Sequence, residues 1–300
     1  MLGSDLAEKF QSAFPTVGIG RSVHPHLTIP YSLCDLTKKE LTQQLIQREK
    51  PQIVFHAAAM TDVDRCQQRR YDALQNNLEA TKNVTDACNR AGALLVFFST
   101  DYVYDGEKQG EYLEDDPPNP RSVYGETKYL AERYIEQRSN RYVIFRTCWL
   151  FGFNGRSFPR TIWERAPKQP AFQVVSDQVG RPTYTRDIAS ALFDLFKKDS
   201  TTLEKVSGQI FHLANEGSVS WADFARFILQ FTPFEKVPVE SISSEQLSRT
   251  APRPLNSVLS LNKLHATFGM TLRPWKEAAA EFLQELKLKG QQPEKVSNHS

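Results

Sequence analysis

The sequence predicts an α/β protein with a doubly wound, Rossmann-type parallel sheet and a smaller α-rich lobe after it. Short, almost continuously apolar runs indicate strands that are buried on both faces, at residues 52–56, 94–99 and 142–147. Amphipathic helical patterns lie between and beside these runs, at residues 37–47, 71–91 and 122–137. Strands and helices in alternation predict a parallel sheet with helices on its faces.

The order of these patterns divides the chain into two parts and a tail. Residues 1–150 carry the regular alternation and are predicted to form the Rossmann-type domain. After Trp149 the alternation loosens, and residues 151–289 are predicted to form mainly the smaller lobe, with helices near 220–230, 261–267 and 275–288. The run at 208–216 is predicted to add a strand to the main sheet, and the polar segment 290–300 is predicted to be disordered.

Composition excludes several classes of function. The 300 residues are 40% hydrophobic with a formal net charge of +2, which gives no electrostatic support for binding nucleic acid or a membrane surface. No apolar run approaches the roughly 20 residues that span a bilayer, and the first residues lack the layout of a secretory signal. The four cysteines are scattered and form no C-x-x-C motif, so they are predicted to be reduced thiols rather than disulfides or zinc ligands. We therefore expect a cytoplasmic protein.

A tyrosine and a lysine four residues apart are the most informative motif. Tyr124 and Lys128 lie at the start of the predicted helix 122–137, where residues i and i+4 share a face. The preceding strand ends in Ser99 and Thr100, which can deliver a hydroxyl beside them. A phenol, a hydroxyl and a nearby cation form a proton-donating site for a carbonyl or alcohol substrate. The pair alone is a weak signal, and its position after this strand strengthens it.

The motifs around this pair resemble those of the extended short-chain dehydrogenase/reductases, and within them the dTDP-4-dehydrorhamnose reductase family. They occur in the expected order over nearly the whole chain, at residues 56–64, 77–83, 99–106, 124–128, 146–152, 177–184 and 253–259. The resemblance implies NADPH-dependent reduction of dTDP-4-dehydro-6-deoxy-L-mannose, a 4-keto sugar, to dTDP-L-rhamnose. It also implies that residues 1–150 bind NADP and that residues 151–289 mainly bind the substrate.

By this resemblance, Thr100, Tyr124 and Lys128 are the catalytic residues. Tyr124 would protonate the C4 oxygen of the substrate as hydride arrives from NADPH, and Thr100 would hold that oxygen. A free phenol has a pKa of about 10, so the ammonium of Lys128 would bring the pKa of Tyr124 toward neutral pH and would also bind the nicotinamide ribose. Asn77 would help to place the lysine. The structural alternatives are that Tyr124 is an aromatic residue on the helix face that covers the core, and that Lys128 is a solvated charge.

The resemblance assigns further residues to the cofactor. Small side chains just after a strand would let the backbone approach it, although simple packing also explains them; they are Ala57, Ala58 and Ala59. Asp35 and Leu36 would contact adenine, and Asp35 is also a suitable helix N-cap. Arg21 follows the second strand, where an arginine suits a 2′-phosphate, so we expect NADPH, with NADH as the alternative.

The substrate side is assigned in the same way. Val103 and Tyr104 lie where the family contacts the nucleotide sugar, and Trp149 resembles the tryptophan that packs on the sugar ring. Arg253 and Asn256 are suited to the diphosphate or the base. The structural alternatives are that Trp149 is a core residue and that Arg253 stabilises the lobe. No metal is predicted, and the expected partner is a nucleotide sugar, with the protein a monomer or a homodimer.

The start of the sequence departs from the family pattern. A dinucleotide-binding fold begins with an apolar strand and a glycine-rich turn that runs into a helix. Here Gly3 matches the last glycine of that turn, and Leu6, Phe10 and Phe14 resemble the buried face of the following helix. The first strand and the two earlier glycines do not precede Gly3 in this sequence. We expect either a start codon assigned too late, which we favour, or a truncated and impaired protein.

Two other functions stay open from the sequence. A non-catalytic, sugar-nucleotide-binding regulatory subunit of the same fold is favoured by the incomplete phosphate cradle, whereas Thr100, Tyr124 and Lys128 favour the enzyme. A nucleotide-sugar epimerase retains NAD and would prefer an acidic residue where Arg21 stands.

Overall fold

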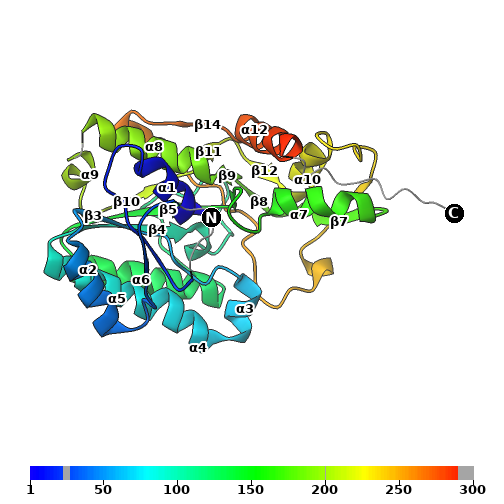
Figure 1. Ribbon diagram of the computed structural model, residues 1–300. Helices are drawn as coiled ribbons and strands as arrows, with labels where there is room; N and C mark the ends of the chain where they lie inside the picture. The colour runs from blue at the N-terminus through cyan, green and yellow to red at the C-terminus, as the bar shows by residue number, and fades with distance from the viewer. Residues whose placement is uncertain (23–27, 200, 290–300) are drawn as a thin grey trace.

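The computed structural model describes residues 1–22, 28–199 and 201–289, and its main sheet is parallel (Figure 1). The order is β10-β5-β4-β3, with strands at Ile53–His56 (β3), Leu94–Thr100 (β4), Tyr142–Thr147 (β5) and Gln209–His212 (β10). The three strands expected from the apolar runs are confirmed, and the segment 208–216 contributes β10 beside β5. The predicted tail, residues 290–300, lies outside the described residues.

Helices cover both faces of this sheet, as a doubly wound fold requires. Figure 1 shows α1 (Leu2–Phe10) and α8 (Thr185–Lys198) on one face of the sheet. On the other face lie α2 (Lys39–Glu49), α5 (Ala80–Ala91) and α6 (Val123–Arg138). The predicted fold class is therefore confirmed.

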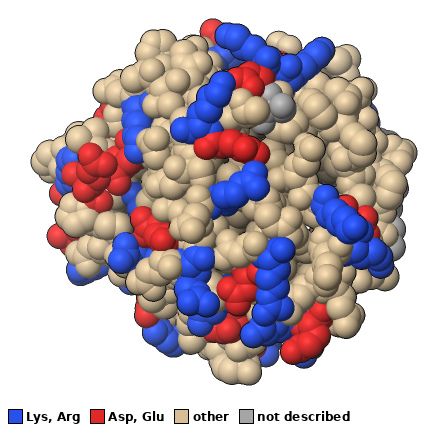
Figure 2. Space-filling view, turned by 90° about the vertical axis from the view of Figure 1, so that its left-hand side faces the viewer, with Lys and Arg blue, Asp and Glu red and all other residues tan. Residues whose placement is uncertain are grey.

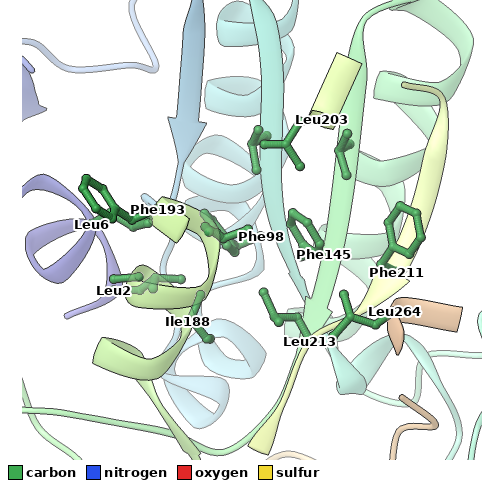
Figure 3. Packing of buried hydrophobic residues seen from close by; sticks show 14 of the residues in the cluster. Leu2, Leu6, Phe98, Phe145, Ile188, Phe193, Leu203, Phe211, Leu213 and Leu264 are labelled. Atoms are coloured by element: carbon green, nitrogen blue, oxygen red, sulfur yellow. The ribbon is translucent and has the colours of Figure 1, made fainter. Parts of the chain in front are cut away.

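Successive side chains of β4 enter two different cores. Leu94, Val96 and Phe98 belong to the cluster under α1 and α8, which Figure 3 shows. Leu95 and Phe97 belong to the cluster with α5 and α6. Because strand residues alternate between faces, a strand that is buried on both faces must be apolar throughout, as this run is.

Helix α1 contributes an aromatic face to the first of these cores. Leu6 and Phe10 are buried in it, and Phe14 packs against it from the turn after the helix, so the predicted apolar face is confirmed. The ring of Phe10 lies 4.9 Å from that of Phe55 and 5.5 Å from that of Phe193, measured between centroids. This packing brings the first residues of the chain to the end of β3.

The predicted helix at 71–91 is interrupted by a π-helical turn. Helix α4 (Arg70–Ala73) continues into the π-turn η1 (Leu74–Glu79) before α5 begins. A π-turn inserts an extra residue into a helix and frequently occurs at functional sites. Here it contains Asn77, whose side chain is buried.

Strands β1 (Gly18–Gly20) and β2 (Tyr31–Leu33) form a separate parallel pair. Within the described residues β1 pairs only with β2, and β3 pairs only with β4. The edge of β3 that faces away from β4 therefore has no strand partner in this part of the chain. Its apolar residues, Ile53, Val54 and Phe55, are accordingly only partly buried, whereas β4 is buried throughout.

A second core lies in the lobe formed by later residues. Helices α7 (Phe158–Arg165), α10 (Trp221–Leu229) and α12 (Trp275–Leu288) enclose buried side chains that include Phe224 and Phe282. Short strand pairs frame it: β6 (Leu150–Phe151) with β9 (Thr183–Tyr184), β7 (Phe172–Val175) with β13 (Val239–Ile242), and β8 (Val179–Gly180) with β12 (Val219–Ser220). Helix α8 follows residue 150 in the sequence and yet packs on the main sheet. The predicted boundary between the two parts of the chain at residue 150 therefore stays a prediction.

Short elements connect these layers: α3 (Val63–Gln68), α9 (Thr202–Lys205), α11 (Asn262–Phe268), β11 (Asn215–Glu216), β14 (Leu272–Pro274), and the 3-10 turns η2 (Asp101–Val103), η3 (Ala166–Lys168) and η4 (Glu245–Leu247).

Figure 2 shows basic and acidic side chains interspersed on one face of the molecule. The four cysteines are buried and carry no disulfide. In the described ranges no helix is long and apolar enough to cross a membrane, and no group of three or more His, Cys, Asp or Glu is arranged to hold a metal.

A buried ion pair joins α6 to β5. Arg146 donates from Nε to one carboxylate oxygen of Glu132 (3.1 Å) and from Nη2 to the other (2.8 Å). The side chains of Arg146 and Glu132 are only 3% and 1% exposed. A guanidinium at this depth is tolerated only with its charge partner in place. Glu132 lies one helical turn after Lys128, so the pair holds the middle of α6 against the sheet.

Replacing Glu132 with alanine is expected to lower the free energy of unfolding by about 3–5 kcal/mol, because it leaves the buried Arg146 charge unpaired. The matched control is Glu136→Ala on the same helix, which removes an exposed ion pair with Arg133 (2.9 Å). That change is expected to cost less than about 1 kcal/mol. Urea-induced unfolding measures both, and equal losses would contradict the role given to the buried pair.

Candidate active site

Hydroxyl and carboxyl groups meet at the carboxyl end of β4. Thr100 is the last residue of this strand and lies opposite Thr147 of β5. Its Oγ1 donates to Oδ1 of Asp101 (2.9 Å), and its hydroxyl also shares a hydrogen bond with the phenol of Tyr124. A chain of hydrogen bonds therefore runs from Tyr124 through Thr100 to Asp101.

Gly125 allows Tyr124 to reach this strand end. The hydroxyl of Ser122 caps α6 by accepting a hydrogen bond from the backbone N–H of Gly125 (3.2 Å). A Cβ atom at Gly125 would overlap the backbone oxygen of Tyr102 in the turn η2. Only glycine fits at this close approach. The first turn of α6 therefore packs directly on η2, and Tyr124 meets Thr100.

The surroundings of Tyr124 favour its neutral form. Burial raises the pKa of the phenol most strongly, the hydrogen bond with Thr100 lowers it, and the neighbouring Asp101, Tyr102 and Cys66 raise it. The ring also packs edge-on against Tyr102, with 5.6 Å between centroids. The phenol consequently keeps its proton at neutral pH and is a donor rather than a base.

Lys128 directs its charge away from Tyr124 in this structure. Its ammonium donates to the backbone oxygen of Phe98 (2.7 Å) and lies 3.9 Å from the centre of the Phe97 ring. The prediction that this ammonium lowers the pKa of Tyr124 is therefore corrected, because a buried carbonyl and an aromatic face bind the ammonium instead. Burial lowers the pKa of Lys128 to about 7, and the charge of Glu132 opposes that shift.

Asp101 is a site residue that the sequence reasoning did not select. One carboxylate oxygen accepts from Thr100, and the side chain also hydrogen-bonds Ser257. The other oxygen, Oδ2, is buried and has no partner among the described residues. Burial raises the pKa of Asp101 to about 7, an environment typical of functional carboxyl groups. Its position directly after Thr100, at the end of a buried strand, is the signal that could have identified it.

The alanines assigned to the cofactor directly follow β3. Ala57 and Ala59 are half-buried and Ala58 is exposed, so the stretch presents small side chains at the surface. Gly3, in the first turn of α1, lies beside it, since a Cβ atom on Gly3 would be 3.6 Å from the Cβ of Ala57. The structure thus brings together residues that are more than fifty positions apart in the sequence.

Asn77 fastens this stretch to the helix of Tyr124. Its Oδ1 accepts from the backbone N–H of Met60 (2.7 Å), and its Nδ2 donates to the Met60 oxygen (3.1 Å). The same Nδ2 donates to Oγ1 of Thr127 (3.0 Å), the residue before Lys128. Asn77 therefore links the alanine stretch to α6, which is the kind of contact that its predicted role requires.

Arg21 and Asp35 follow β1 and β2. Arg21 is exposed and donates from Nη1 to Oδ1 of Asn76 (3.0 Å). Asp35 accepts from the backbone N–H (3.0 Å) and hydroxyl (2.8 Å) of Thr37, so it caps the turn before α2. Burial raises the pKa of Asp35, but the Thr37 hydrogen bonds and the charge of Arg21 outweigh it and lower the pKa. Leu36 packs partly buried against the core under α5 and α6.

Two of the residues predicted to bind substrate, Val103 and Tyr104, are buried in the interior, and a third, Asn256, is half-buried. Val103 and Tyr104 are 0% and 1% exposed. The Tyr104 hydroxyl donates to the backbone oxygen of Leu113 (2.8 Å) and accepts from Arg146 (2.7 Å). Nδ2 of Asn256 donates to the backbone oxygens of residues 108 (2.8 Å) and 110 (2.6 Å). Packing holds the side chains of Val103 and Tyr104, and hydrogen bonds to the backbone hold the amide of Asn256, so their predicted contacts with a nucleotide sugar stay predictions.

Trp149 and Arg253 are the two remaining residues predicted to bind substrate, and both are half-buried. Trp149 follows β5 two residues after Thr147 and is half-buried. Arg253 donates from Nη2 to Asp64 (2.9 Å), and its guanidinium lies 5.9 Å from the centre of the Tyr102 ring, which itself packs on Tyr124. Nη1 of Arg253 is buried without a partner among the described residues. This donor is therefore the part of the Arg253 side chain that its contact with Asp64 does not engage.

Comparison with known proteins gives consistent relatives. The chain matches the family described as RmlD substrate binding domain over residues 1–288. It is 35% identical over 257 residues to dTDP-4-dehydrorhamnose reductase of Aggregatibacter actinomycetemcomitans, which covers 84% of this chain and 87% of the relative. A crystal structure of dTDP-4-dehydrorhamnose reductase from Bacillus anthracis in complex with NADP has a TM-score of 0.81 at 30% identity, covering 90% of this chain and 98% of that one. A UDP-glucose 4-epimerase from Thermotoga maritima, with a TM-score of 0.82 at 16% identity and 96% of each chain covered, shares the fold alone.

Replacing Asp101 with asparagine is expected to change how stability depends on pH. The folded-state pKa of about 7 lies above the ordinary value of 3.8, so the folded state holds its proton more tightly. The resulting stabilisation is complete below the unfolded-state pKa and is lost as the pH rises through the folded-state pKa. The advantage of the wild type over the variant should therefore shrink between about pH 4 and pH 8 in urea unfolding.

The control for this experiment is Asp115→Asn, which removes one carboxylate from an exposed position. A stability difference between wild type and Asp101→Asn that is the same at every pH would show that Asp101 is not a buried, proton-binding carboxyl group.

Proposed function

Because the chain belongs to the RmlD substrate binding domain family, we propose that it reduces dTDP-4-dehydrorhamnose to dTDP-L-rhamnose with NADPH. The named relatives, dTDP-4-dehydrorhamnose reductases, and the NADP in one of their crystal structures support the reaction and the cofactor. The observation that carries the proposal is the hydrogen-bond chain from Tyr124 through Thr100 to Asp101. Reduction of a keto group needs a proton donor at its oxygen, and this chain supplies one.

Tyr124 is the proton donor in this proposal. NADPH, when bound, supplies hydride to the C4 carbon of the keto sugar. The C4 oxygen then gains negative charge and accepts the proton of the Tyr124 phenol, while the Thr100 hydroxyl holds the same oxygen. The raised pKa of Tyr124 keeps the phenol protonated until that charge develops. Water-poor surroundings strengthen these hydrogen bonds relative to those in bulk solvent.

The residues of the cofactor side fit a dinucleotide phosphate. Gly3 and the alanine stretch leave space for close approach of a backbone and a pyrophosphate, and Arg21 offers a largely exposed guanidinium for a 2′-phosphate. The full set assigned to the cofactor is Gly3, Arg21, Asp35, Leu36, Ala57, Ala58, Ala59, Asn77, Tyr124 and Lys128. In this assignment Glu132 favours the charged form of Lys128, which binds ribose hydroxyls.

On the substrate side we assign Trp149, Arg253 and Asp101. The unpaired Nη1 of Arg253 suits an anionic diphosphate oxygen, and the unpaired Oδ2 of Asp101 suits a sugar hydroxyl. Trp149 offers an aromatic surface to the sugar. No substrate contact is assigned to Val103 and Tyr104, because they are buried, or to Asn256, because its amide donates to two backbone oxygens.

The alternative functions have weaker support. An epimerase rests on the shared fold at 16% identity, and Arg21 stands where such an enzyme would carry an acid. A regulatory subunit has no need of the Tyr124 and Thr100 hydroxyls that the chain carries. We further propose a cytoplasmic monomer or homodimer.

Oxidation of NADPH by the protein in the presence of dTDP-4-dehydrorhamnose is the direct test of this function. Replacing Tyr124 with phenylalanine should lower kcat by about 100- to 10,000-fold, because the proton donor is lost while the ring is kept. The matched control is Tyr134→Phe on the same helix, whose hydroxyl donates to Asp86 (2.9 Å) and also hydrogen-bonds Arg138; it should retain its rate. Absence of turnover by the wild type would reject the proposed function, and full activity of Tyr124→Phe would reject the proton donor.

Replacing Arg21 with alanine should raise KM for NADPH by about tenfold or more, because a charge-assisted hydrogen bond to the 2′-phosphate is lost. KM for NADH should change little, since NADH lacks that phosphate. Arg48→Ala is the control, because Arg48 is an exposed arginine that bonds Ser32 of the neighbouring β2 (3.0 Å). An equal rise in KM for both cofactors would contradict the role of Arg21.

A further inference from the structure

We propose that Trp221 and Gly180 are positioning residues that hold the Trp149 indole in place for the nucleotide sugar. The inference rests on the proposed function for its substrate, but its structural basis is independent of it. Both residues come from the later lobe: Gly180 lies in β8, and Trp221 directly follows β12, the strand that pairs with β8. Trp149, in contrast, follows the main-sheet strand β5.

Trp149 has an unfavourable backbone conformation. Its φ angle is +47°, in the left-handed region that residues with a side chain rarely adopt. Two hydrogen bonds tie this stretch to the segment 181–183: the Cys148 thiol donates to the oxygen of Arg181 (3.3 Å), and the N–H of Thr183 donates to the oxygen of Trp149 (3.1 Å). Such strain persists only when the surroundings fix the residue, and it is concentrated at functional positions.

The indole of Trp149 stacks on that of Trp221. The ring centroids are 3.5 Å apart and the planes are inclined by 7°. Trp221 is itself fixed, as the first residue of α10, by the Ser220 cap that accepts from the N–H of Asp223 (3.1 Å). Phe158 packs against Trp221 at 4.5 Å between centroids. Trp221 therefore sets the plane in which the Trp149 ring lies.

Gly180 makes room for the same ring. A Cβ atom at this position would overlap Cε2 of Trp149 and lie 2.6 Å from its Nε1. Any side chain here would push the indole away from its present place. The antiparallel pairing of β8 with β12 sets Gly180 opposite Val219 and Val179 opposite Ser220, directly before Trp221. One strand pair thus supplies both the space for the indole and the ring that stacks on it.

This arrangement is joined to the proton-donating site. The Ser257 hydroxyl hydrogen-bonds Asp101, and its oxygen would lie 2.7 Å from a Cβ atom at Gly180. Since Asp101 accepts from Thr100, the indole, Ser257 and the hydroxyl chain occupy one continuous region. A fixed indole plane at this place determines which face of a pyranose ring can pack on it, and therefore how the keto carbon meets Tyr124.

The test compares Trp221→Leu and Gly180→Ala with the wild type. Both should raise KM for dTDP-4-dehydrorhamnose by about tenfold, since uniform substrate binding is weakened, and leave KM for NADPH unchanged. Trp275→Phe, a change in the core of the same lobe, is the control and should leave both KM values unchanged. Trp221→Phe, which retains an aromatic ring, should recover most of the affinity.

A structural readout separates this inference from the proposed function. Two stacked indoles couple their electronic transitions, so the circular dichroism spectrum should contain an exciton couplet that Trp221→Leu and Trp149→Phe abolish and Trp275→Phe keeps. If the wild type does not turn over, the same variants are compared for binding of dTDP-L-rhamnose by calorimetry. A couplet that survives in Trp221→Leu, or substrate and product affinities equal to those of the wild type, would overturn the positioning role.

Discussion

Burial of β4 on both faces is the constraint on which the candidate site depends. All seven residues of this strand are buried, and alternate side chains fill two separate cores. A shift by one residue would send every side chain into the opposite core, so packing specifies the register strongly. That register sets Thr100 opposite Thr147 at the strand end. The place of the Thr100 hydroxyl is therefore a consequence of the apolar residues that precede it in the strand.

Helix α6 is held to this strand end by two different means. Gly125 permits contact with the Tyr102 backbone at the first turn, and the buried pair of Glu132 with Arg146 holds the helix further along. Between these points, polar groups in the interior have partners, as buried polar groups normally do. The exceptions among the described residues include Oδ2 of Asp101, whose charge acts on the phenol, and Nη1 of Arg253, whose guanidinium lies over the Tyr102 ring.

Much of this could be predicted from the sequence, for physical reasons. Strands buried on two faces leave continuous apolar runs, and a hydroxyl after such a run followed by Tyr124 on a helix indicates a site at the strand end. Side-chain direction could not be predicted in the same way. Lys128 turns to the Phe98 carbonyl, and Tyr104 turns inward to Arg146, because those partners come from distant segments. The separation of β1 and β2 from β3 likewise depends on pairing that no local pattern encodes.

The motifs at 177–184 and 253–259 join the surroundings of Trp149 to those of Asp101. They are far apart in the sequence, yet Val179 bridges to Asn256 and accepts from the N–H of Ser257 (2.8 Å). This pairing brings Gly180, which borders the indole, next to Ser257, which hydrogen-bonds Asp101. Movement of this segment would therefore change the plane of the Trp149 ring and the hydrogen bonding of Asp101 together. Because Thr100 donates to Asp101, the orientation of the Thr100 hydroxyl, and with it the phenol of Tyr124, follows the position of the later lobe.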